Sequence, residues 1–135
     1  PGTTYYTLAY EWYLFNEEWI ESGWQRLLGA SRATSELLRA EGIPVLLMVM
    51  PSRFVFAGDA TNPQREFSRA LLDRTTTFAE QNDIPYLDLT EAVGGAGGAT
   101  AFVDTLHLNQ AGNVAVGTAL YEYMSAGMLQ PTAPR

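Results

Sequence analysis

The sequence of 135 residues contains no cysteine and no lysine, and it has a single histidine. Without cysteine the chain can form no disulfide bond, no thiolate metal site and no cysteine nucleophile. One histidine also excludes a histidine-rich metal centre. No apolar run reaches the roughly 18 residues that a membrane-spanning helix needs, and no signal peptide is visible.

Charge and hydrophobicity narrow the class of protein further. The formal net charge is −7 and the isoelectric point is about 4.5, which argues against nucleic acid and anionic membranes as partners. The 47% hydrophobic and 17% charged residues are typical of a globular protein. We expect one domain, residues 1–135, large enough to bury about two thirds of the surface of the unfolded chain.

The spacing of apolar residues predicts alternating strands and helices. Residues 4–15 are rich in aromatic side chains and predict a strand, with a helix over part of this window as the alternative. Steps of three and four predict an amphipathic helix that ends at Gly42. Its expected inner face consists of Trp24, Leu27, Leu28, Ser31, Ser35 and Leu38. Residues 45–50 are apolar without alternation, which predicts a strand buried on both faces.

The second half of the chain continues this alternation. Asn62 and Pro63 predict the start of a helix that ends near Asn82, and residues 84–89 predict the next strand. The glycine-rich segment 94–98 predicts a flexible connector and lacks the spacing of a phosphate-binding loop. A last helix is expected from Asn109 to Gly127, followed by a frayed tail at 127–135. The side chains expected to face inward from the two helices are Phe67, Leu71, Arg74, Phe78, Val114, Leu120, Tyr123 and Met124.

A faint repeat indicates how the strands are arranged. Gly42-Ile43-Pro44 and Asp83-Ile84-Pro85 each lead from a helix into a strand. Strand, helix, strand, helix and strand in this order imply a parallel α/β sheet with right-handed crossovers. Ligands of such sheets bind outside the carboxyl ends of the strands, so we expect the chemistry there.

The residues suited to catalysis lie in segment 101–113. It holds the only histidine, His107, and Asp104 three residues earlier. Imidazole can take and return a proton near neutral pH, and a carboxylate on one ring nitrogen aims the other nitrogen at the substrate. A non-helical loop lets both side chains face one spot. The alternative is a histidine that only caps the surface loop.

The residues on either side of this pair resemble a family motif. Phe-Val-Asp-Thr-Leu-His-Leu-Asn-Gln-Ala-Gly-Asn, followed by a small-to-apolar helix, resembles the last sequence block of the SGNH (GDSL-type) hydrolases. The resemblance implies a three-layer α/β/α, flavodoxin-like parallel sheet, with Asp104 and His107 completing a Ser-His-Asp triad. It also implies an ester substrate, such as an O-acyl or O-acetyl group on a carbohydrate or lipid, and neither a metal nor an organic cofactor.

Two further positions are candidates for the site. Asn16 stands where the family places the asparagine of its oxyanion hole. The family motif there is Gly-x-Asn-Asp, whereas this sequence has Leu-Phe-Asn-Glu. The alternative is that Asn16 is a helix N-cap. Arg53 could orient a substrate at the rim, or it could be a solvated surface arginine. Asp88 is expected to cap the turn at Thr90 and to take no part in catalysis.

The nucleophile of such a hydrolase is missing from the sequence. None of the serines is part of a Gly-Asp-Ser motif. We therefore expect this chain to be the C-terminal portion of a longer hydrolase, lacking its first strands and inactive alone. Many family members are exported, so a secreted or cell-envelope location in a bacterium is a further expectation. A carbohydrate O-acyltransferase of the same fold and a non-catalytic α/β binding module are the alternatives.

Overall fold

A computed structural model describes residues 17–58 and 62–127 of the chain. The expected strand at 4–15, Asn16 and residues 128–135 of the expected tail lie outside these described residues. The elements in chain order are α2 (Glu17–Ala40), β1 (Leu47–Val49), the 3-10 turn η1 (Arg53–Val55), α3 (Pro63–Gln81), β2 (Tyr86–Asp88), α4 (Thr90–Gly95), the 3-10 turn η2 (Gly98–Ala101) and α5 (Gln110–Ser125).

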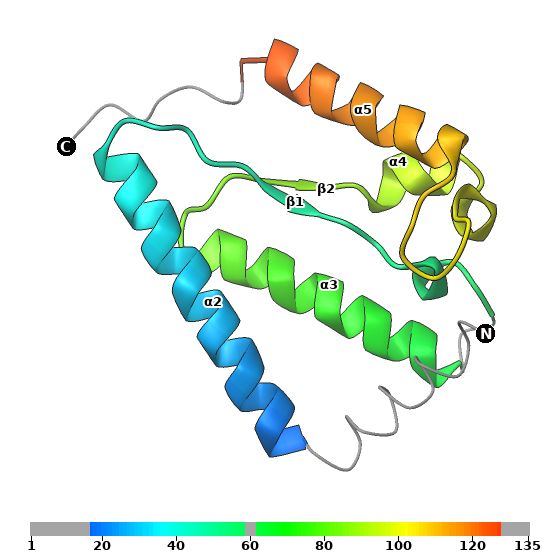
Figure 1. The fold of residues 1–135 in the computed structure, drawn as a ribbon, viewed down its shortest axis with the longest axis horizontal. Helices are drawn as coiled ribbons and strands as arrows, with labels where there is room; N and C mark the ends of the chain where they lie inside the picture. Colours follow the sequence, from blue (N-terminus) through cyan, green and yellow to red (C-terminus); the bar gives the residue numbers. More distant parts are fainter. Residues whose placement is uncertain (1–16, 59–61, 128–135) are drawn as a thin grey trace.

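The two strands pair in parallel, as the alternation of elements predicted. Leu47 lies opposite Tyr86 and Val49 lies opposite Asp88. Figure 1 shows α3 on one side of this strand pair and α4 and α5 on the other. No further strand joins an outer edge of the pair within residues 17–58 and 62–127. The described part is thus a mixed α/β structure with a small parallel sheet.

The predicted repeat is present in the backbone. Gly42 and Asp83 end their helices with positive φ angles of 70° and 53°. In each turn the next amide, of Ile43 or Ile84, donates a 2.9 Å hydrogen bond to a carbonyl five residues back in the helix. These bonds satisfy carbonyl groups at the helix end that would otherwise lack a partner. Both strands are therefore entered through the same type of helix cap.

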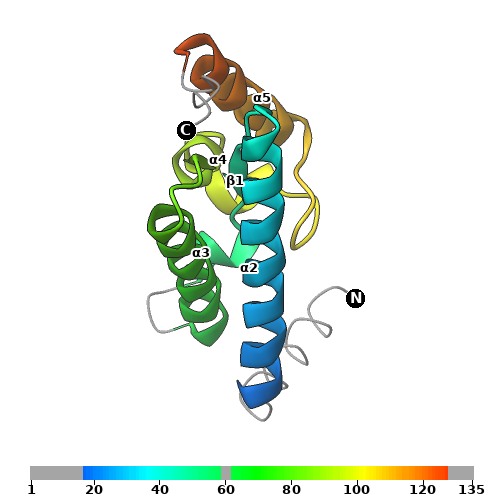
Figure 2. The same cartoon turned by 90° about the vertical axis from the view of Figure 1, so that its left-hand side faces the viewer.

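Side chains join α2 to α3, which lie side by side in Figure 2. The Arg39 guanidinium donates a 2.8 Å hydrogen bond to the carbonyl oxygen of Asp83 at the shared end of the helices. Arg74 pairs with Glu21 and lies 5.4 Å from the centre of the Trp24 ring. The expected inward position of Arg74 is thus explained by partners on α2.

The predicted ends of α3 are confirmed, but the prediction for one residue on the inner face of α2 is wrong. The side chain of Asn62 accepts hydrogen bonds from two amides of the first turn of α3, and Asn82 forms its C-cap. On α2, Ser35 is buried, whereas Leu27 is 56% exposed. Leu27 is therefore not on the packed face of this helix.

The prediction that residues 45–50 are buried on both faces is wrong. Val49 is buried, but Met48 and Met50 are 39% and 41% exposed. The regular strand is also shorter than predicted, at Leu47–Val49. The physical reason is that Met48 and Met50 border an open groove between β1 and α3 and are not fully covered by the helix.

The glycine-rich segment is built into the fold and is not the flexible connector that its composition predicted. Gly94 and Gly95 belong to α4, and Gly98 begins η2. Gly98 is buried, with φ of 57°, and a Cβ atom there would lie 3.2 Å from the side chain of Phe56. Glycine is thus favoured at this position by close packing and by a left-handed backbone.

The main hydrophobic cluster lies where α4, η2 and α5 meet. Its buried members are Val93, Ala101 and Phe102, packed by Phe56, Ala96, Leu108 and Val116. On α5, Leu120 and Tyr123 are half-buried as expected, but Val114 and Met124 are 62% and 54% exposed. Val114 is exposed because it lies two positions, or about 200° around the helix, from both Gly112 and Val116, which face the core. Met124 lies in the last turn of α5, away from the cluster packed against the first half of the helix.

Two glycines of α5 give a direct test of this packing. A Cβ atom at Gly112 would lie 2.6 Å from the Ala101 carbonyl oxygen, whereas one at Gly117 would meet nothing within 4 Å. We expect Gly112→Ala to lower the free energy of unfolding by about 1–3 kcal/mol through overpacking. We expect Gly117→Ala to raise it by about 0.5–1 kcal/mol through helix propensity. Urea unfolding of both variants checks this, and a shift of the same sign in both would contradict it.

Candidate functional site

The segment that holds Asp104 and His107 is a short closed loop between η2 and α5. Phe102 and Leu108 form an isolated antiparallel bridge at its base. Inside the bridge, the Val103 amide donates a 2.9 Å hydrogen bond to the carbonyl oxygen of His107. Since Phe102 and Leu108 also belong to the hydrophobic cluster, the core fixes both ends of the loop.

The carboxylate of Asp104 organises the loop from within. Its Oδ1 accepts hydrogen bonds from the amides of Leu106 and His107, at 2.9 Å and 2.8 Å. Its Oδ2 lies 2.7 Å from Nδ1 of the His107 ring. The contact predicted from the Asp-x-x-His spacing is thus present. One carboxylate sets both the backbone turn and the position of the imidazole.

These contacts determine the charge of the Asp104 carboxylate. The two backbone amides, of His107 and then of Leu106, together with the imidazole, lower the pKa of Asp104 from 3.8 to about 2. Asp104 is therefore ionised at neutral pH and can only accept hydrogen bonds, so Nδ1 of a neutral imidazole carries the proton. Nε2 is then left as a proton acceptor, which is the arrangement that a general base requires.

The loop lies at the carboxyl end of β1, as the position of ligand sites in α/β sheets predicted. The Arg53 amide, just beyond the end of β1, donates a 2.9 Å hydrogen bond to the carbonyl oxygen of Thr105. Figure 1 shows the loop beside η1 at this end of the molecule. The His107 side chain is 78% exposed and that of Asp104 is 52% exposed. The imidazole is thus accessible to a ligand or to water.

The other predicted site residues are placed as follows. Arg53 is exposed and begins η1 near the loop. Asp88 accepts a 2.8 Å hydrogen bond from the amide of Thr90, which confirms its expected role as a cap. Asn16 lies outside the described residues, so its expected role in an oxyanion hole stays a prediction.

The described residues bring no serine hydroxyl to the imidazole. The serine at the end of β1, Ser52, donates a 3.0 Å hydrogen bond to the hydroxyl of Ser68 on α3. Within residues 17–58 and 62–127, the ring of His107 has Asp104 as its hydrogen-bonding partner. A complete Ser-His-Asp triad is therefore not assembled from the described part of the chain.

Sequence reasoning missed an apolar groove beside the loop. This β1–α3 groove has a volume of about 450 Å³, and its lining includes Met48, Ser52, Ser68, Leu71, Leu72 and Leu106. The only sequence signal for it is the helical spacing of Phe67 and Leu71 on α3, which does not reveal that the neighbouring strand leaves space. Leu106 joins the groove to the loop, because it precedes His107 directly.

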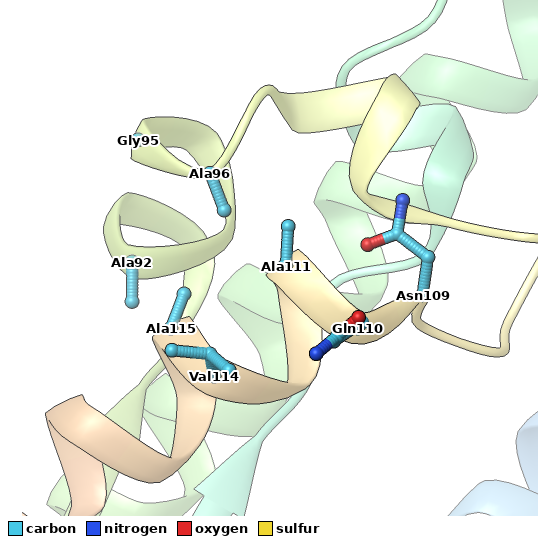
Figure 3. A pocket seen from close by; sticks show the side chains of 8 residues that line it. All are labelled: Ala92, Gly95, Ala96, Asn109, Gln110, Ala111, Val114 and Ala115. Atoms are coloured by element: carbon cyan, nitrogen blue, oxygen red, sulfur yellow. The ribbon is translucent and has the colours of Figure 1, made fainter.

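A second hollow, between α4 and α5, has no chemistry of this kind. Figure 3 shows the side chains of Ala92, Ala96, Ala111 and Ala115 in the space between the two helices. Asn109 is one of its polar residues, but it is already used as the N-cap of α5, where it accepts a hydrogen bond from the Gly112 amide. The described residues that line this hollow include no titratable side chain. The loop around His107 is thus the better candidate site.

The described residues contain neither a cluster of metal-ligating side chains nor a membrane-spanning helix. Residues 17–58 and 62–127 contain no group of three or more histidine, aspartate or glutamate side chains placed to hold a metal ion. None of the helices in the same ranges is long and apolar enough to cross a bilayer.

The depressed pKa of Asp104 predicts how the loop responds to acid. The ionised carboxylate favours the folded loop above the ordinary pKa of 3.8, and this contribution is lost as the pH falls toward about 2. Asp104→Asn removes the titration but keeps a side-chain oxygen. We expect wild type to exceed the variant in free energy of unfolding at about pH 5, and the difference to shrink toward about pH 2. Urea unfolding at both pH values checks this, and a constant or growing difference would contradict it.

Comparison of the chain with protein-family models, with curated proteins and with solved structures finds no match. What the chain does is therefore inferred from its own residues: a carboxylate–imidazole pair in a closed loop, next to the carboxyl end of a parallel strand and an apolar groove.

Proposed function

We propose that this chain supplies the acid–base pair of an SGNH-type serine hydrolase that cleaves an ester. The observation that carries the proposal is the 2.7 Å contact between Asp104 Oδ2 and His107 Nδ1, in a loop whose sequence resembles the last block of that family. The exposed imidazole beside it is free to meet a nucleophile. No metal or organic cofactor is needed for this chemistry.

In the proposed mechanism, His107 moves a proton twice. Nε2 takes the proton of a serine hydroxyl while the serine oxygen attacks the acyl carbon of the ester. The imidazolium, stabilised by ionised Asp104, then returns the proton to the leaving alkoxide. Water repeats the cycle on the acyl-enzyme and releases the acid. Asn16 is proposed to donate from its side-chain amide to the oxyanion, an interaction worth about 3 kcal/mol in comparable enzymes.

The serine is proposed to come from a segment outside these 135 residues, within a longer parent protein. The outer edge of β1 has no partner strand among the described residues, and Met50 beside it is 41% exposed. The strand expected at 4–15 would pair with this edge and would then form a new edge rich in Tyr, Trp and Phe. Exposed apolar strand edges tend to aggregate, so a natural sheet is expected to continue beyond that strand. Further parallel strands there would complete a three-layer, flavodoxin-like sheet and bring their carboxyl ends to the rim near His107.

The exposure of the pair supports hydrolysis over acyl transfer in this proposal. At 78% exposure, the His107 side chain is open to water, which favours water over a sugar hydroxyl as the acyl acceptor. A sheltered imidazole would favour the acyltransferase alternative, since transfer requires that water be excluded.

A non-catalytic binding module is the second candidate. The observation that favours it is that Asp104 Oδ1 accepts two backbone amides, which is a structural role sufficient to explain this carboxylate. In that case the imidazole would only complete the surface of the loop. The two candidates differ in whether a reactive serine faces His107 in the parent protein.

Turnover of a chromogenic ester by the parent protein tests the role of the pair. We expect His107→Ala, and also Asp104→Asn, to lower kcat by about 10⁴-fold without unfolding the protein, because each removes the oriented base. Asp88→Asn is the matched control, since Asp88 also caps a backbone amide but lies outside the proposed triad. Retention of most activity in His107→Ala would refute the proposed role.

A serine-directed fluorophosphonate probe distinguishes the two candidates. We expect the parent protein to be labelled at one serine, and labelling to be strongly slowed in His107→Ala, because the probe reacts with an activated hydroxyl. Peptide mapping identifies the labelled residue. Absence of labelling in the folded parent protein would favour the binding module.

A further inference from the structure

The β1–α3 groove differs in polarity along its length. One end contains Ser52 and Ser68, whose hydroxyls are hydrogen-bonded to each other, and adjoins Leu106 of the loop that holds Asp104 and His107. The other end is formed by Met48, Leu71 and Leu72. The groove thus has a polar end beside the loop and an apolar end that runs back along β1.

Among residues 17–58 and 62–127, no charged side chain lines the groove. Thr75, the polar residue of the apolar end, donates its hydroxyl to the carbonyl oxygen of Leu71 in its own helix at 2.7 Å. The apolar end therefore presents no polar side-chain group that a ligand would need to satisfy. The volume of the groove, about 450 Å³, is within the range of small-ligand sites. Such sites are mostly apolar, with a few polar groups at one place.

We propose that this groove binds the unbranched, medium-length acyl chain of the ester, with the carboxyl end at Ser52 and Leu106 and the tail along Met48, Leu71 and Leu72. The inference rests on the proposed function for the identity of the ligand as an acyl group. It selects a medium-chain acyl ester over an acetyl ester, since an acetyl group would leave the apolar end empty. A strand added at the outer edge of β1 would extend the floor of the groove.

The acid released by hydrolysis is a suitable probe, because its binding needs no nucleophile. Octanoate, hexanoate, butyrate and acetate differ only in tail length. A fully buried methylene group improves affinity by about fourfold, so octanoate is expected to bind much more tightly than butyrate. Titration of the full chain with each acid, followed by NMR of ¹³C-methyl-labelled methionine, measures affinity and location together.

Three of the four methionines of the chain distinguish the groove from the rest of the surface. Met48 and Met50 line the groove, whereas Met124 is exposed on α5 outside it. We expect octanoate to shift the methyl signals of Met48 and Met50 in a saturable way and to leave that of Met124 unchanged. A shift of all three, or equal affinity for octanoate and acetate, would overturn the proposal.

A matched pair of variants tests the groove directly. Met48→Glu places a carboxylate in the apolar end and is expected to weaken octanoate binding by about tenfold or more. Met124→Glu makes the same change at a more exposed site and is expected to leave the affinity unchanged. Circular dichroism establishes whether both variants are folded. If Met48→Glu is not folded, Leu72→Phe replaces it as the test, because it fills the groove without adding charge.

The outcomes separate this proposal from the proposed function. Saturable octanoate binding that Met48→Glu abolishes supports the groove as an acyl site even if the parent protein cleaves no ester. Ester cleavage by the parent protein, without chain-length-dependent binding in the groove, supports the hydrolase and overturns the acyl site. Failure of all acids to bind also overturns it, as expected if a polypeptide segment fills the groove.

Discussion

The double role of the Asp104 carboxylate is the interaction on which the candidate site depends. One oxygen accepts two backbone amides and fixes the turn, while the other holds the imidazole of His107 at 2.7 Å. Three hydrogen-bond donors around one carboxylate explain why its pKa falls to about 2. The ionised group then selects one tautomer of the ring. The geometry of the pair is therefore set within the loop 103–107, whose two ends are held by the core residues Phe102 and Leu108.

The features predicted from the sequence are those that depend on residues close together in the chain. The Asp104–His107 contact spans three positions, and the caps at Gly42 and Asp83 arise from bonds within one helix end and its turn. The alternation of elements follows from local apolar spacing, so the order of helices and strands and their parallel pairing were also predictable. Local hydrogen bonds need no knowledge of the tertiary arrangement.

The incorrect predictions concern which surfaces pack against each other. Apolar periodicity does not show that Met48 and Val114 stay exposed, or that Gly98 is buried beneath Phe56. The groove next to the loop was missed for the same reason, since it exists only where α3 and β1 come together. Hydrophobic spacing reports the tendency of a side chain to be buried, whereas its burial depends on the element that covers it. The three-layer sheet and the nucleophile stay predictions because they involve residues beyond those described.

The most direct measurement of the central claim is the tautomer of the single imidazole. Because the chain has one histidine, a long-range ¹H–¹⁵N NMR spectrum shows its two ring nitrogens without ambiguity. At a pH where the ring is neutral, the pairing with Asp104 predicts a proton on Nδ1 and a bare Nε2. A proton on Nε2, or an even mixture of the two tautomers, would mean that Asp104 does not orient the ring and that His107 is not prepared to act as a base.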